Sequence, residues 1–168
     1  MRNPMKWFPA IVLAVALAVP LAAVPQSAPI PYGAPITTEA ARKVAAGALA
    51  EAKKNGWNVA VSVVDSGGVL AYFEKSENTQ YGSVEASLEK ARTSSAFRRP
   101  SKAFEDVVLG GKVNYTKLPG ATPLEGGLPI VVDGKIVGAV GISGATSAQD
   151  GQCAKAGVDA LAAKQGGT

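Results

Sequence analysis

Two apolar segments joined by Asp133-Gly134 constrain the fold of this chain more than any other feature. Asp-Gly between apolar runs predicts a β-hairpin with a type I′ turn, because both central residues of that turn need a positive φ. The second segment, 136–143, has no charge on either face, so we expect a strand that is buried on both faces and central in its sheet. Glycines inside such a strand mark a place where a helix or a ligand comes close to the backbone.

Helical and extended patterns alternate along the rest of the chain. Apolar residues at helical spacing predict helices over about 38–54, 81–99 and 146–163, and a short helix after Ser101. Alternating patterns predict a hairpin of strands 57–64 and 69–74, while 113–117 is a candidate edge strand before an ordered loop, 118–128. Helices between two hairpins make an antiparallel sheet covered by helices, which is an α+β domain with αβα layers. We expect a single domain, 37–164, followed by a frayed tail, 165–168.

The N-terminal segment is expected to be a targeting signal. Arg2 and Lys6 precede the apolar run 7–23, and small residues follow it. This pattern is typical of a secretory signal peptide, which we place at 1–28; an uncleaved membrane anchor is the alternative. Residues 29–36 are rich in proline and predict an extended arm. We therefore expect a periplasmic or secreted protein with no membrane contact after cleavage.

Composition excludes several kinds of site. The chain contains no histidine, which removes Ser-His-Asp and Cys-His catalysis and histidine metal ligands, and we expect no metal site. Cys153 has no partner for an intrachain disulfide, and a buried inert thiol is favoured over a nucleophile. Without Arg2 and Lys6, 15 basic residues remain against 13 acidic ones, a balance that does not indicate nucleic acid. The basic pair Arg98-Arg99 is expected at a solvated helix end rather than at a polyanion site.

Several ordered motifs between residues 37 and 163 resemble the GlcG/HbpS family. They are Val63-Val64-Asp65-Ser66-Gly67-Gly68, Lys90-Ala91-Arg92-Thr93, Phe97-Arg98-Arg99-Pro100, Glu125-Gly126-Gly127-Leu128-Pro129-Ile130 and Ser143-Gly144-Ala145-Thr146-Ser147-x-x-Asp150. The resemblance implies a profilin-like fold with an antiparallel sheet of about five strands flanked by helices. It also implies homo-oligomers, as dimers that assemble to octamers in some members. A related domain forms the C-terminal part of some cobalamin adenosyltransferases.

The resemblance makes haem a candidate cofactor, because some family members bind it and take part in redox sensing. Members often carry a histidine after the Gly-Gly of the first hairpin, where this chain has Val69. Tyrosinate and thiolate also serve as axial ligands of haem iron, and a hydroxyl is a weaker candidate. The residues of these types that we consider are Tyr32, Tyr72, Tyr81, Tyr115, Cys153 and Thr93. Opportunistic binding of haem to an apolar groove is a separate alternative.

Two glycine-containing segments are predicted to form the ligand site. Free N–H groups at the start of the last helix favour an anion, and glycines allow a ligand to approach the backbone. A carboxylate, a phosphate or a haem propionate would suit this collection. The predicted ligand-binding residues are Glu125, Gly126, Gly127, Pro129, Gly144, Ala145, Thr146, Lys90, Arg92 and Phe97. In the structural alternative, the glycines form turns, Thr146 caps a helix, and Phe97 belongs to the core or to a subunit contact. Lys90 then forms an ion pair with Glu125.

Our leading hypothesis is an exported, homo-oligomeric protein that binds a small anionic or haem-like ligand without catalysis. The alternative is a histidine-free isomerase or lyase acting on a small oxo-acid, with Glu125 as the base and Lys90 and Arg92 as oxyanion stabilisers. A third hypothesis, a structural or partner-binding module, applies if the two glycine segments lie far apart. The oligomer surface is expected on the stripe 81–95 or on the arm 29–36.

Overall fold

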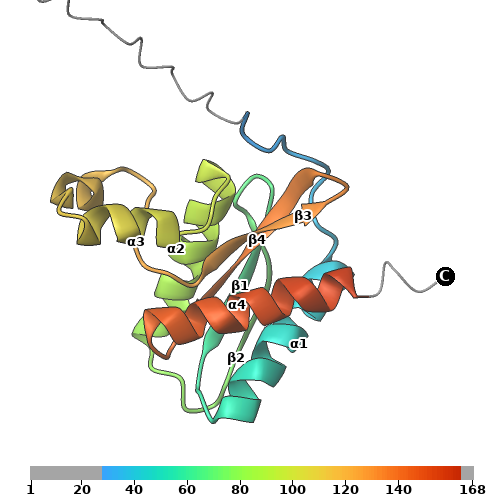
Figure 1. Ribbon diagram of the computed structural model, residues 1–168. Coiled ribbons are helices and arrows are strands. Elements are labelled where there is room, and N and C mark those ends of the chain that lie inside the picture. The colour runs from blue at the N-terminus through green and yellow to red at the C-terminus, as the bar shows by residue number, and fades with distance from the viewer. Residues whose placement is uncertain (1–27, 164–168) are drawn as a thin grey trace, which may run out of the picture.

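The computed structural model describes residues 28–163 as an antiparallel sheet with helices on both faces (Figure 1). The predicted signal peptide, but for its last residue, and the predicted tail lie outside the described residues. Within 28–163, no helix combines the length and the apolar character needed to cross a membrane. The elements are α1 (Thr38–Asn55), β1 (Ala60–Asp65), β2 (Leu70–Lys75), α2 (Gly82–Phe97), α3 (Lys102–Leu109), the 3-10 helix η1 (Val113–Lys117), β3 (Gly127–Val132), β4 (Lys135–Ser143) and α4 (Ser147–Ala162).

Strand β4 lies inside the sheet, as the uncharged pattern predicts. The strand order is β2-β1-β4-β3, and β4 pairs antiparallel with both β1 and β3. The turn between β3 and β4 has φ values of 49° at Asp133 and 70° at Gly134, which are the positive values that the predicted hairpin requires. A Cβ at Gly141 would lie only 2.0 Å from the carbonyl oxygen of Ser87 in α2, so this strand glycine makes room for a helix.

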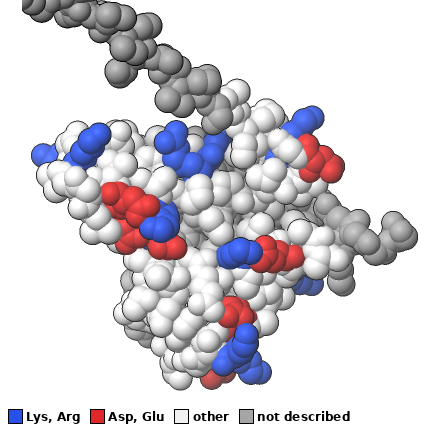
Figure 2. Space-filling view, in the orientation of Figure 1, with Lys and Arg blue, Asp and Glu red and all other residues white. Residues whose placement is uncertain are grey.

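Two helical layers cover the sheet. Helices α1 and α4 pack against each other on one face, and α2 packs on β1 and β4 from the other (Figure 1). The larger core lies under α1 and α4, and it includes Val44, Val61 and Ile142. Exposed ion pairs lie on α3, between Lys102 and Asp106, and on α4, between Lys155 and Asp159. Figure 2 shows basic and acidic side chains next to each other on this face of the molecule. The predicted αβα arrangement is therefore confirmed.

Among residues 28–163 the sheet has four strands, slightly fewer than the expected count of about five. The candidate edge strand 113–117 is the 3-10 helix η1, which has no buried residue. Local hydrogen bonds from the N–H of Tyr115 to the Lys112 carbonyl and from Leu118 to Tyr115 replace strand pairing. The proline-rich arm is attached to the sheet, because the N–H of Gly33 donates to the Ile136 carbonyl and the N–H of Ile136 donates to the Pro31 carbonyl.

Candidate functional site

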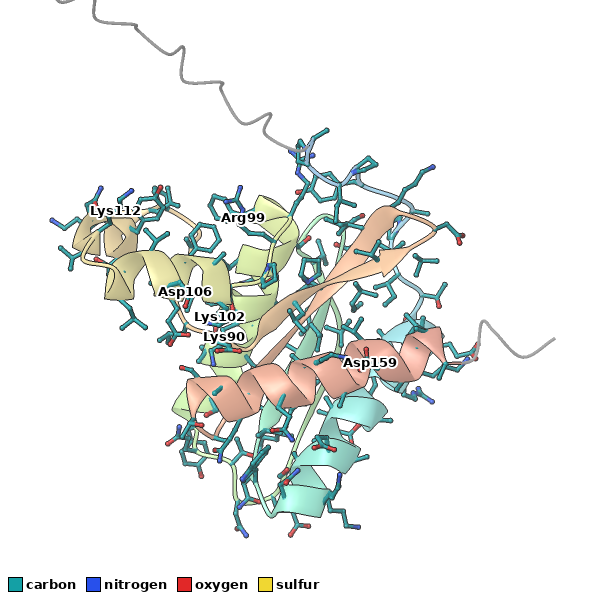
Figure 3. The ribbon with its side chains drawn as sticks, in the orientation of Figure 1. Lys90, Arg99, Lys102, Asp106, Lys112 and Asp159 are labelled. Carbon is teal, nitrogen blue, oxygen red and sulfur yellow. The ribbon has the colours of Figure 1, made fainter. Side chains whose placement is uncertain are left out.

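The two glycine-containing segments meet in space, at a buried ion pair between α2 and α4. Lys90 Nζ lies 2.7 Å from Asp150 Oδ2, and the two side chains are 3% and 2% exposed. Lys90 also donates to the Ile142 carbonyl at 3.0 Å, and Asp150 Oδ1 accepts from the N–H of Ala145 at 3.1 Å. Figure 3 shows Lys90 near the beginning of α4. We call this arrangement of Lys90, Asp150, Ile142 and Ala145 the buried junction.

The two charges of the buried junction are compensated by each other and by backbone groups of the protein. Burial raises the pKa of the Asp150 carboxyl, and the hydrogen bond and charge of Lys90 oppose that rise. The free-energy cost of removing two charges from water is offset only when the ion pair has good geometry and the charged groups make further hydrogen bonds. Here the Ile142 carbonyl and the Ala145 N–H provide those further hydrogen bonds. Asp150 is not among the residues predicted for the ligand site. Its position four residues before buried Ala154, on the inward stripe of that helix, was the available signal that it points into the core.

Gly126 and Gly127 bring the start of β3 against the buried junction. A Cβ at Gly127 would lie 2.3 Å from the Lys90 carbonyl oxygen and 2.6 Å from Ser94 Oγ. A Cβ at Gly126 would lie 2.9 Å from Asp150 Cβ and 3.0 Å from Lys90 Nζ, and its φ is +128°. These glycines therefore permit close packing of protein on protein, and the space beside them is already filled. Pro129 is half-buried within β3, where it pairs with Ala139.

Glu125 does not pair with Lys90, so the alternative of a Lys90–Glu125 ion pair is wrong. The Lys90 amine is committed to Asp150, 60 residues along the chain. The Glu125 side chain lies over Gly151 of α4, where an added Cβ would come within 2.4 Å of Oε1. Its backbone N–H donates to Glu105 Oε2 at 2.9 Å. Among residues 28–163 the carboxylate of Glu125 accepts no hydrogen bond.

The segment Gly144-Ala145-Thr146 begins α4 with its N–H groups engaged. Thr146 is the N-cap, and it forms a capping box with Gln149. The N–H of Thr146 donates to Gln149 Oε1, the N–H of Gln149 to Thr146 Oγ1, and the N–H of Ala145 to Asp150. A helix start binds anions through free N–H groups. Here three of those donors already have acceptors in the protein.

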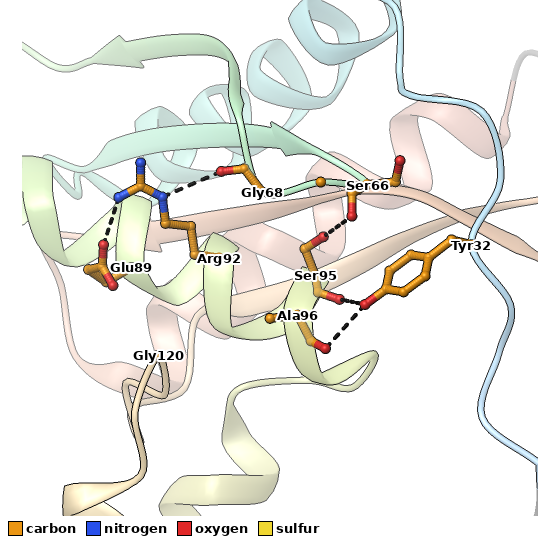
Figure 4. A pocket seen from close by; sticks show the side chains of 9 residues that line it. Tyr32, Ser66, Gly68, Glu89, Arg92, Ser95, Ala96 and Gly120 are labelled. Carbon is orange, nitrogen blue, oxygen red and sulfur yellow. Dashed lines mark hydrogen bonds and ion pairs between the residues drawn. The ribbon is translucent and has the colours of Figure 1, made fainter.

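Arg92 and Phe97 lie away from the buried junction, beside two adjoining cavities at the C-terminal end of α2. One cavity, of about 410 Å³, is lined by α2 residues that include Arg92 and Ala96, by the turn 66–68 and by Tyr32 (Figure 4). The other, of about 590 Å³, lies between residues 28–30 and residues 96–99. Ala96 lines both, so the two cavities adjoin at this residue. We call the two cavities together the arginine groove, defined by Tyr32, Arg92, Phe97, Arg98 and Arg99.

The C-terminal end of helix α2 forms one wall of the arginine groove. Arg98 has a left-handed conformation with φ of 56° and is the C-cap, so the predicted helix end at Arg98-Arg99 is confirmed. Its guanidinium lies 5.2 Å from the centroid of the Tyr32 ring. The Tyr32 hydroxyl donates to the carbonyls of Ser95 at 2.8 Å and Ala96 at 3.1 Å, which ties the arm to the end of the helix (Figure 4).

The cations of the arginine groove differ in how far they are neutralised. Arg92 pairs with Glu89 at 2.9 Å and donates to the Gly68 carbonyl. Arg98 and Arg99 form no ion pair with any residue of 28–163. Arg99 lies 5.7 Å from the Phe104 ring, which in turn meets Phe97 edge to face at 5.0 Å. The groove thus combines two uncompensated cations with aromatic rings.

Of the six candidate haem ligands, Tyr32 is the one that lines the arginine groove. Burial raises the pKa of the Cys153 thiol to about 11, and the side chain lies within the main core. Thr93 is buried, and its hydroxyl lies between the Glu89 carbonyl and the Thr122 N–H. The remaining three lie elsewhere: Tyr72 donates to Glu74 on β2, Tyr81 is exposed before α2, and Tyr115 belongs to η1. No cluster of three or more metal-ligating side chains occurs within 28–163.

The structure does not bring the three residues of the enzymatic hypothesis to one place. Lys90 is enclosed by the buried junction, Arg92 faces the turn between β1 and β2, and Glu125 lies over α4. A general base and its oxyanion stabilisers must face the same substrate. Separate surroundings for these three side chains remove the geometric basis of that mechanism.

Comparison with known proteins gives a consistent set of relatives. The family described as haem degrading protein HbpS-like matches residues 36–159. GlcG of Escherichia coli (strain K12) is 42% identical over 108 residues, which make up 64% of this chain and 81% of GlcG. The crystal structure of HbpS has a TM-score of 0.70 and 30% identity, and the match covers 76% of this chain and 90% of that one. The PduOC:haem complex has a TM-score of 0.68 at 24% identity, covering 75% and 94%, and this likeness concerns the fold alone.

Proposed function

Because the chain belongs to the family of haem degrading HbpS-like proteins, we propose that it binds haem in the arginine groove. The observation that carries the proposal is the pair of uncompensated cations, Arg98 and Arg99, beside aromatic side chains and two adjoining cavities. A haem presents a flat apolar ring and two propionates, and small-molecule sites of this kind pair an apolar wall with a few placed charges. Arginine suits a carboxylate because its guanidinium can donate two parallel hydrogen bonds.

The residues present fit such a ligand at three points. Arg98 and Arg99 would hold the propionates, since neither has a carboxylate partner in the described chain. Phe97 offers an apolar surface at the second cavity. Tyr32 is the candidate axial ligand, and it would have to release the carbonyls of Ser95 and Ala96 to take that role. When bound, haem supplies a redox-active iron.

The proposal does not include the Glu125 base mechanism, because the residues assigned to it face different surroundings. It also moves the predicted ligand site from the two glycine segments to the end of α2. Of the predicted site residues, it keeps Arg92 and Phe97.

Haem titration followed by Soret absorbance tests the proposal. We expect a saturable shift with one haem per chain, and a changed absorption spectrum in Tyr32→Phe. Tyr81→Phe is the matched control, because Tyr81 is 93% exposed and lies outside the groove. A broad, non-saturating response that is the same in every variant would reject a specific haem site.

The proposal includes export and self-association. The N-terminal pattern of residues 1–28 supports export, and the family resemblance supports a homo-oligomer. Mass spectrometry of the protein recovered from the periplasm or medium tests the first part, since cleavage near residue 28 gives a shortened chain. Analytical ultracentrifugation tests the second, and a monomer at every concentration would contradict it.

A further inference from the structure

A second groove, lined in part by the glycine segment Gly144-Ala145-Thr146, has a wholly uncharged lining. Its volume is about 450 Å³, and it lies between the end of α1, the loop after β2 and the start of α4. Side chains that line it are Trp57, Asn58, Asn78, Gln80, Thr146 and Gln149, and the rest of the lining is glycine and alanine. We call it the amide groove. It shares no residue with the arginine groove.

Three amide side chains of this groove are free to bind a ligand. Asn58, Asn78 and Gln80 are exposed, and none of their side chains makes a hydrogen bond within residues 28–163. Each carries two N–H donors and a carbonyl acceptor. Gln149 uses its Oε1 on the N–H of Thr146, which leaves its NH₂ group for other partners. The groove therefore offers donors and acceptors side by side, as a hydroxyl-rich ligand requires.

Trp57 supplies the apolar surface of the amide groove. The indole is half-buried, packs against the main core and lines the groove as well. Its backbone is fixed, since its N–H donates to the Ala52 carbonyl at 2.9 Å directly after the left-handed Gly56. A rigid aromatic side chain of this kind gives contact area at little entropic cost and accepts the C–H face of a polar ligand.

We propose that the amide groove binds a neutral polyhydroxylated molecule, a sugar or a polyol. Such a ligand has an apolar C–H face for Trp57 and hydroxyl groups that both donate and accept hydrogen bonds. An anion would be poorly served here, because the lining has no cation and three N–H groups at the start of α4 are already bound.

Fluorescence of Trp57 tests the proposal in the full chain. The chain has two tryptophans, so Trp7→Phe leaves Trp57 as the one emitter. The probes are glucose, galactose and N-acetylglucosamine as sugars, glycerol and inositol as polyols, and sodium acetate and sodium phosphate as anions. We expect a saturable change with at least one sugar or polyol, and the two groups of probes distinguish these sources. Asn78→Ala and Gln80→Ala should weaken that binding by about tenfold each, as expected for lost polar contacts.

Asn114→Ala is the matched control, because Asn114 is an exposed amide on η1 and does not line the groove. Its affinity should equal that of the Trp7→Phe parent. The proposal is overturned if no sugar or polyol gives a saturable change, or if acetate or phosphate alone does so. Equal affinities in the Asn78, Gln80 and Asn114 variants would also overturn it, because the ligand would then bind elsewhere.

Discussion

The buried junction uses a basic residue inside α2 and the arginine groove uses basic residues directly after its end, yet their chemistry is opposite. At the junction the Lys90 side chain is 3% exposed and is neutralised by Asp150. At the groove, Arg98 leaves the helix in a left-handed conformation and has no acidic partner in the described chain. The difference shows that a cation is available to a ligand only where the fold has left it unpaired and accessible. Both residues are basic and both belong to motifs of the family, so neither property alone distinguishes the two places.

Removal of the buried Asp150 carboxylate should have the largest effect on stability, because it leaves the Lys90 charge of the buried junction without its partner. We expect Asp150→Ala to lower the free energy of unfolding by about 3–5 kcal/mol, since Lys90 would stay buried without a partner. Chemical denaturation measures the change. Asp106→Ala, at an exposed pair with Lys102, is the control and should cost no more than about 1 kcal/mol. A loss that small for Asp150→Ala would mean that Lys90 finds another partner or water.

A methyl group at Gly127 should have the next largest effect, because it tests whether the glycine segment serves packing. The added Cβ would meet the Lys90 carbonyl oxygen at 2.3 Å, so we expect Gly127→Ala to cost about 1–3 kcal/mol through overpacking. Gly82→Ala is the control, since nothing lies within 4 Å of its added Cβ, and it should change stability by no more than about 0.5 kcal/mol. If Gly127→Ala keeps full stability but alters haem binding, the segment is part of a ligand site after all.

The smallest expected effect concerns Cys153, which lies in the core near the junction. Burial raises the pKa of its thiol from 9.0 to about 11, so the folded protein keeps this proton while the unfolded chain loses it. Stability should therefore fall as the pH rises from about 9 towards about 11, and the slope should be shallower in Cys153→Ala. Denaturant unfolding at several pH values measures both slopes. Identical slopes would show that the thiol titrates alike in both states.

Local signals in the sequence predicted the framework well. Asp133-Gly134 and the uncharged strand after it were sufficient for the hairpin and for the central place of β4. Thr146 caps its helix as the structural alternative expected, because capping depends on residues within one turn. The resemblance to the GlcG/HbpS family is confirmed by the family match and by GlcG itself.

Long-range partners could not be predicted in the same way. The pairing of Lys90 with Asp150 depends on how α2 and α4 meet across β4, and no spacing in the sequence encodes that meeting. Residues 113–117 alternate like a strand, but none of them is buried in a sheet, and local turns prevail. The arginine groove needs the arm beside the end of α2, a contact between segments 63 residues apart.

Haem affinity of two variants, measured side by side, tests the central claim most directly. Arg98→Ala/Arg99→Ala removes the free cations of the arginine groove, and Glu125→Gln changes the glycine segment without adding bulk. We predict that the double arginine variant binds haem at least about tenfold more weakly, as expected for lost charged contacts, while Glu125→Gln binds as the parent does. Unchanged affinity in the arginine variant together with weakened binding in Glu125→Gln would contradict the account.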